Sequence, residues 1–108
     1  MRNSSELRAR RHYRLRAYRI LGENVWIGGY ELDLVVRRGS TIVICEVKGK
    51  SGIGFGDPLE MVTPEKVRRV RQAASAWLAA HPEHARCTVR FDVVAERAGR
   101  LERITAAF

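Results

Sequence analysis

The sequence has few of the features that mark secreted, membrane-spanning or disulfide-rich proteins. It contains two cysteines in 108 residues, which is too few for a disulfide framework. No apolar run approaches the roughly 20 residues of a membrane-spanning helix. The arginine-rich N-terminal segment also lacks the apolar stretch of a signal peptide. We therefore expect a single cytoplasmic domain over residues 1–108, with no membrane partner.

Two common ligand-binding motifs are also missing. The glycine-rich residues 49–57 lack the strand-loop-helix form and the terminal Lys-Ser/Thr of a P-loop, although they can form a flexible loop that approaches a ligand closely. His81, His84 and Cys87 do not have a standard zinc spacing, and a surface turn that ends a helix is the better interpretation. Cys45 lies in an apolar run, so we expect a free cysteine in the core.

Positive charge is what the sequence has in excess. Lysine and arginine number 20 against 12 aspartates and glutamates, which gives a net charge of +8. Basic residues gather in residues 2–19 and again in residues 66–71. Because such patches attract phosphate backbones, nucleic acid is the expected partner. The alternative is that the arginines only form a solvent-exposed helix face and bind no partner. The residues assigned to nucleic-acid contacts are Arg10, Arg11, Arg14, Lys50, Arg68 and Arg69.

Periodicity and end signals predict an α-β-β-β-α-β-β order, which indicates an α/β domain with helices flanking a sheet. The predicted elements are a helix over 5–16, strands over 18–26, 31–36 and 41–50, a helix over 63–80, and strands over 88–95 and 101–105. Ser4 or Ser5 is expected to cap the first helix, and Thr63 the second. The apolar stripe of the first helix, on which Glu6 also falls, consists of Ala9, Tyr13 and Ala17. Trp26 and Trp77 are expected to make core or subunit contacts.

Residues 31–36 and 41–50 are predicted to pair as a hairpin. Gly39 and Ser40 suit the two central positions of a tight turn. With this turn, one face of the hairpin is wholly apolar and consists of Leu32, Leu34, Val36, Val43, Cys45 and Val47. The other face is apolar only near the turn, so we expect both faces to be covered there, with a cleft at the charged end.

The charged end of this hairpin carries the candidate site. The predicted register places Asp33 opposite Glu46 and Glu31 opposite Lys48, and alternation puts Asp33, Glu46 and Lys48 on one face. Two anions about 5 Å apart repel by roughly 3 kcal/mol at an effective dielectric constant near 20. A cation between them removes this penalty, and paired carboxylate oxygens are ligands that Mg²⁺ or Mn²⁺ prefers. A structural network of acids and lysine is the alternative.

Several short motifs, taken in order, resemble one known family. They are Tyr18-Arg19-Ile20-Leu21 with Asn24, Glu31-Leu32-Asp33-Leu34, Glu46-Val47-Lys48, Phe55-Gly56-Asp57-Pro58 and Arg90-Phe91-Asp92-Val93-Val94. Together they look like the YraN-like family of bacterial proteins, which resembles archaeal Holliday-junction resolvases of the PD-(D/E)xK nuclease superfamily. The resemblance implies a restriction-endonuclease-like three-layer fold around a central mixed five-stranded sheet. The chain departs from the family at Tyr30 and Ser5, where glycine is usual, and at Lys50, where arginine is common.

The resemblance also implies a role for each matched residue. Asp33 and Glu46 would ligate Mg²⁺ or Mn²⁺, with the Val47 carbonyl and Glu6 as further ligands. Lys48 would position or activate the attacking water and stabilise the developing phosphorane charge. The implied activity is metal-dependent hydrolysis of DNA, including branched DNA, by a homodimer. A nucleic-acid-binding protein without catalysis, and an assembly factor with acidic partners, are the alternatives.

Overall fold

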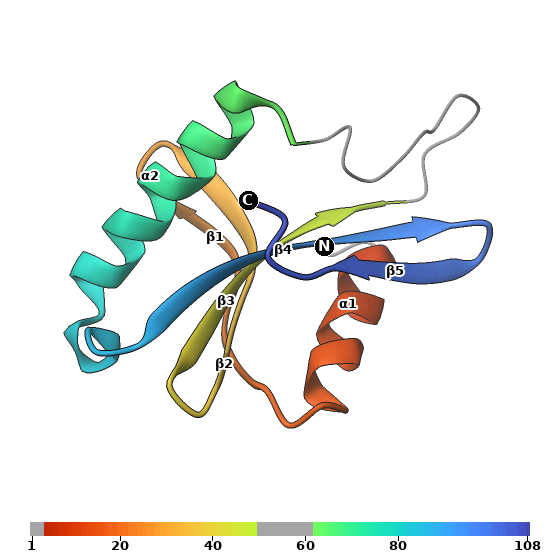
Figure 1. The fold of residues 1–108 in the computed structure, drawn as a ribbon, viewed down its shortest axis with the longest axis horizontal. Coiled ribbons are helices and arrows are strands. Elements are labelled where there is room, and N and C mark those ends of the chain that lie inside the picture. Colours follow the sequence, from red (N-terminus) through yellow and green to blue (C-terminus); the bar gives the residue numbers. More distant parts are fainter. Residues whose placement is uncertain (1–3, 50–61) are drawn as a thin grey trace.

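The computed structural model describes residues 4–49 and 62–108, which form one sheet with a helix on each side (Figure 1). The elements are α1 (Ser4–Arg14), β1 (Arg19–Ile27), β2 (Tyr30–Arg38), β3 (Thr41–Lys48), α2 (Pro64–Ala80), the 3₁₀ helix η2 (Pro82–His84), β4 (Thr88–Arg97) and β5 (Arg100–Ile104). The predicted order is confirmed, with η2 added in the turn after α2. Neither helix in these two ranges is long and apolar enough to cross a membrane. The predicted loop over 49–57 lies outside the described residues beyond Gly49.

The five strands form one mixed sheet in the order β1-β2-β3-β4-β5. Strands β3 and β4 are parallel, whereas the other three neighbouring pairs are antiparallel. A parallel pair needs a long crossover, and the segment that contains α2 supplies it. Because α1 and α2 cover opposite faces, the molecule has three layers, as the predicted nuclease-like fold requires (Figure 1).

Helix α2 covers one face of the sheet. Thr63 caps it as predicted, because its hydroxyl accepts the Lys66 N–H at 3.2 Å, and Pro64 takes the first helical position. The buried residues of this layer are Val70, Ala73, Ala74 and Trp77 on the helix, with Leu32, Val35, Ile42, Ile44 and Phe91 beneath them. Trp77 is therefore a core residue, whereas Trp26 on the edge strand β1 is 71% exposed.

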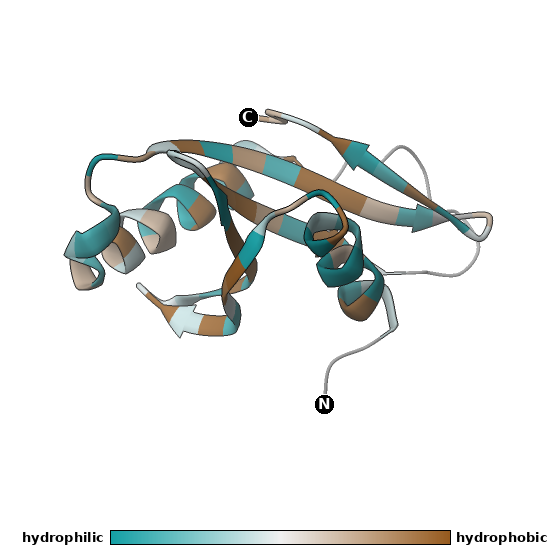
Figure 2. Ribbon diagram, turned by 90° about the horizontal axis from the view of Figure 1, so that it is seen from below, coloured by the Kyte–Doolittle hydropathy of each residue, from teal (hydrophilic) through white to brown (hydrophobic). Residues whose placement is uncertain are grey.

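Helix α1 covers the other face with a short stripe. Ala9 and Tyr13 are fully buried against the sheet, as predicted. The prediction was wrong for Ala17, which is exposed after the helix end and has φ +67°. Ser5 does not cap the helix, because it lies inside α1 and donates its hydroxyl to Glu96 Oε1 at 2.6 Å. Figure 2 shows the resulting contrast between the mostly hydrophilic α1 and the alternating strands.

Strands β1 and β2 change their packing face at Asn24 and Asp33. Asn24 has φ +50°, a left-handed conformation that asparagine tolerates better than most residues. On β2, the two neighbours of Asp33 pack in different layers: Leu34 in the α1 layer and Leu32 in the α2 layer. The prediction that Leu32 and Leu34 share one face was therefore wrong, because the hairpin does not stay regular through Asp33.

A buried carboxylate joins three elements near the centre of the fold. Asp92 on β4 is 0% exposed and accepts hydrogen bonds from the Tyr13 hydroxyl at 2.7 Å and from the Ala106 N–H at 3.0 Å. The Arg90 guanidinium adds two more, each at 2.9 Å. The Asp92 carboxylate thereby ties α1 and the segment after β5 to the sheet.

We expect Asp92→Ala to lower the free energy of unfolding by roughly 3 kcal/mol, because the Tyr13 hydroxyl and the Ala106 N–H lose their acceptor. Chemical denaturation measures the change. Glu83→Ala, which removes an exposed carboxylate, is the control and should change the stability by less than about 0.5 kcal/mol. A loss for Asp92→Ala as small as that of the control would contradict this account.

Candidate metal and nucleic-acid site

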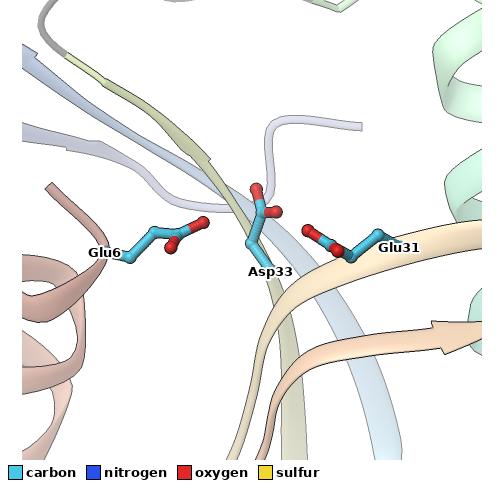
Figure 3. Close-up of side chains that lie close together, drawn as sticks. All are labelled: Glu6, Glu31 and Asp33. Carbon is cyan, nitrogen blue, oxygen red and sulfur yellow. The ribbon is translucent and has the colours of Figure 1, made fainter. Parts of the chain in front are cut away.

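Three carboxylates meet at the end of the sheet where β2 and β3 separate. Glu6 comes from the first turn of α1, and Glu31 and Asp33 come from β2. One oxygen of each lies within 4.8 Å of the others. Figure 3 shows Glu6 and Glu31 reaching toward Asp33 from opposite sides. Residues that are far apart in the sequence thus form one acidic cluster.

A backbone hydrogen bond holds Asp33 in this position. The Val47 N–H donates to Asp33 Oδ2 at 2.8 Å. The ladder between β2 and β3 has the predicted register from Arg38↔Thr41 to Leu34↔Cys45. The pairs predicted for Asp33 and Glu31 are not part of this ladder, because at this point the Asp33 side chain takes the Val47 N–H and Glu31 joins the acidic cluster.

Glu46 on β3 is the most deeply buried acid of the site, with 2% of its surface exposed. The Tyr30 hydroxyl donates to Glu46 Oε1 at 2.9 Å. Glu46 Oε2 is buried and has no hydrogen-bond partner among the described residues. One oxygen of this carboxylate is therefore held in place by Tyr30, and the other makes no hydrogen bond within the described part of the chain.

The pKa values of both central acids are raised. Burial raises the pKa of Asp33 most, the Glu6 charge adds to the shift, and the Val47 N–H opposes it. Burial also raises the pKa of Glu46, followed by the charge of Asp33, whereas the hydrogen bond from Tyr30 opposes the rise. Lys66, in the first turn of α2, lowers the pKa of both acids. Burial is thus the main cause of both shifts, and the charges of neighbouring acids add to it.

Four residues of the site were not assigned to it from the sequence. Asn24 donates from Nδ2 to Glu6 Oε2 at 3.2 Å, and Tyr30 donates to Glu46. Glu31 completes the acidic cluster, and Lys66 acts on it from α2. The sequence contained a weak indication of two of them. Asn24 belongs to one of the family motifs, and Tyr30 stands where the family usually has glycine. Nothing in the sequence placed Lys66 near Asp33.

The residues present fit a hard divalent cation. Carboxylate oxygens are what Mg²⁺ and Mn²⁺ prefer, and Glu46 Oε2 is a buried oxygen without a partner in the described part of the chain. Glu6, Glu31 and Asp33 lie close enough together to hold the ion, whereas Glu46 is not in this group, so its role as a metal ligand stays a prediction. Lys48 follows Glu46 by two residues on β3, so alternation directs both side chains to the α2 face. The role of the Val47 carbonyl stays a prediction.

The predicted nucleic-acid contacts lie on two separate surfaces. Arg11 and Arg14 are exposed on α1, where Arg10 lies 3.2 Å from Glu23. Arg68 and Arg69 are exposed on α2, on the opposite side of the sheet (Figure 1). Lys50 lies outside the described residues. The arginines therefore flank the sheet from both sides.

The fold and the site define a three-layer α/β domain of nuclease-like architecture with an acidic cluster at one end of its sheet. Residues 5–95 match the model of the Uncharacterised protein family UPF0102, and the chain belongs to this family. This confirms the predicted YraN-like resemblance. The chain is 46% identical to a UPF0102 protein of Acidothermus cellulolyticus over 96 residues, which cover 81% of this chain and 73% of the relative. It is 40% identical to one of Parafrankia over 105 residues, which cover 93% and 88%.

The raised pKa of Asp33 predicts how stability depends on pH. The folded state binds this proton more tightly than the unfolded state, whose aspartate pKa is about 3.9. The contribution of protonated Asp33 to the free energy of unfolding is therefore fully present below about pH 3.9. It is lost as the pH rises through the higher pKa of the folded state. Asp33→Asn can keep the Val47 hydrogen bond but removes the charge. Without metal, it should raise the free energy of unfolding at neutral pH by about 1–2 kcal/mol.

Denaturant unfolding in EDTA at about pH 4 and about pH 7.5 measures this difference. The gain from Asp33→Asn should disappear at the acid pH. Glu83→Gln, which neutralises an exposed acid, serves as the control. A gain of equal size at both pH values would show that the charge of Asp33 is not its cause.

Proposed function

We propose that this protein is a metal-dependent endonuclease that hydrolyses phosphodiester bonds in DNA, including branched DNA. The observation that carries the proposal is the convergence of Glu6, Glu31 and Asp33 beside a buried Glu46 with one unpartnered oxygen. Acids are brought together at a cost in repulsion, and a divalent cation removes that cost. Family membership and the nuclease-like fold support the proposal.

A bound Mg²⁺ or Mn²⁺ would supply charge to polarise the phosphoryl oxygen and lower the pKa of the attacking water. The protein's part is positioning. Asp33 is held by the Val47 N–H and Glu46 by the Tyr30 hydroxyl, so the two central acids are oriented before any ligand arrives. Lys48 orients the water and balances the charge that develops on the phosphate.

The basic surfaces support DNA as the substrate. The first turn of α1 contributes Glu6, and the first turn of α2 contributes Lys66, so both arginine-bearing helices begin beside the acidic cluster. DNA that lies across this end of the sheet meets Arg10, Arg11 and Arg14 on one side. It meets Arg68 and Arg69 on the other. Phosphate contacts of this kind position a duplex without reading its sequence.

We expect Mn²⁺- or Mg²⁺-dependent cleavage of plasmid, single-stranded or branched DNA, and its loss by at least about 100-fold in Glu46→Gln, which removes a metal ligand. Calorimetric titration with Mn²⁺ should show weaker binding in the same variant. Glu83→Gln, which changes an exposed acid outside the site, should cleave and bind as the wild type does.

Cleavage that survives both Asp33→Asn and Glu46→Gln would refute the assignment of these acids. Binding to DNA that falls steeply with salt, without cleavage in any metal, would favour the non-catalytic alternative. Capture of a protein partner that persists after nuclease treatment would favour the assembly factor.

We also propose that the active form is a homodimer, as the resolvase-like resemblance implies. The 71% exposed Trp26 on the edge strand β1 supports a contact there. X-ray scattering should give the mass of a dimer for the wild type and that of a monomer for Trp26→Glu. A wild-type monomer at all concentrations would refute this part of the proposal.

A further inference from the structure

A basic recess lies beside the acidic cluster, between the β1–β2 turn and α2. It has a volume of about 370 Å³. Its lining residues are Gly28, Gly29, Tyr30, Arg68, Arg69 and Gln72. Since a water molecule takes about 30 Å³ in the liquid, the recess has room for a phosphodiester group and part of its sugar.

Two glycines of the β1–β2 turn line one side of this recess. Gly28 and Gly29 have φ +62° and +77°, so both adopt the left-handed conformation that glycine takes without strain. A Cβ on Gly28 would lie 3.1 Å from Ala73 Cα, which shows how closely the turn packs on α2. A Cβ on Gly29 would meet no atom within 4 Å. The turn is thus pressed against the helix on one side and open on the other.

The lining favours an anion with several acceptor oxygens. Arg68 and Arg69 present guanidinium donors from the helix, and Gln72 follows one turn later with an exposed amide. In the free protein, both arginines bind Glu65, with the shorter contacts at 2.9 and 2.8 Å. Exposed pairs of this kind contribute little, and a phosphate offers arginine a better partner. Glu65 therefore competes for these donors without closing the recess.

Tyr30 connects the recess to Glu46, which lies beside the acidic cluster. Its side chain lines the recess, and its hydroxyl donates to Glu46 Oε1 at 2.9 Å. Burial raises the pKa of this hydroxyl, the Glu46 charge raises it further, and the Arg69 charge opposes the rise. The Tyr30 hydroxyl therefore lies between the positive charge of Arg69 and the negative charge of Glu46. A polyanion that reaches the acidic cluster through a cation can place its next phosphate in the recess.

We propose that the recess is a subsite for a DNA backbone phosphate next to the one at the acidic cluster, bound by Arg68, Arg69 and Gln72. This inference rests on the proposed function. It goes beyond the general basic charge of the chain, because it assigns one phosphate to one set of residues. Glu65 would regulate the affinity of the subsite by holding its arginines.

Matched substitutions on α2 test the subsite. Gln72→Glu adds a negative charge inside the recess, whereas Ser75→Glu adds the same charge at an exposed position of α2 that does not line it. We measure the affinity for a fluorescently labelled DNA duplex in EDTA over a range of salt concentrations. Gln72→Glu should weaken binding by about tenfold and reduce the salt slope by about 1, whereas Ser75→Glu should change the affinity by about twofold or less.

Removal of the cations gives a second comparison. Arg69→Ala should also reduce the salt slope by about 1. Arg86→Ala, which removes the same charge beyond the C-terminal end of α2, should have a much smaller effect. Glu65→Gln should strengthen binding, because it releases both arginines. Thermal unfolding of each variant checks that the fold is intact, and all these side chains are exposed.

Equal effects of Gln72→Glu and Ser75→Glu would overturn the subsite, and so would unchanged or weaker binding in Glu65→Gln. If either outcome is found and the wild type still cleaves DNA with metal, the proposed nuclease function stands without the subsite. If binding depends on the recess but no metal supports cleavage, the subsite stands and the hydrolytic function fails. A wild-type protein that binds no DNA, either in EDTA or with Mn²⁺, overturns both proposals.

Discussion

The hydrogen bond from the Val47 N–H to Asp33 Oδ2 is the interaction on which the arrangement of this site depends. It replaces ladder pairing where β2 and β3 separate, and it turns the Asp33 carboxylate into the opening between the two helix layers. Beside Asp33, Leu32 and Leu34 pack into different layers, so the irregular backbone is supported on both faces. A regular hairpin would carry its acids on one face and would leave Glu6 too far away to join them.

The mixed topology explains why both helices begin at this end of the sheet. Strand β3 pairs antiparallel with β2 and parallel with β4, and α2 lies in the crossover between β3 and β4. Helix α1 packs on the opposite face through Ala9 and Tyr13. Their first turns therefore deliver Glu6 and Lys66 to the same place. The positive ends of the two helix dipoles favour the negative charge that gathers there.

The buried acids of the site lower the stability of the folded protein at neutral pH. Burial and the charges of neighbouring acids raise the pKa values of Asp33 and Glu46, so ionisation of either acid at neutral pH costs more in the folded protein than in the unfolded chain. Elsewhere a buried acid is fully satisfied: Asp92 accepts hydrogen bonds from Tyr13, Arg90 and Ala106. Both oxygens of Asp92 accept hydrogen bonds, whereas Oε2 of Glu46 accepts none within the described residues. This difference is typical of a structural carboxylate on the one hand and of a functional-site carboxylate on the other.

The sequence by itself determined the order of the elements, the turn at Gly39, the register near it and the cap at Thr63, because these depend on neighbours along the chain. It also pointed to Asp33, Glu46 and Glu6, through alternation and motif resemblance. Only the tertiary structure decided that Asp33 turns out of the ladder, that Tyr30 holds Glu46, and that Glu31 and Lys66 join the site. These contacts link residues from different elements, and their geometry is set by packing across the sheet, which no local pattern records.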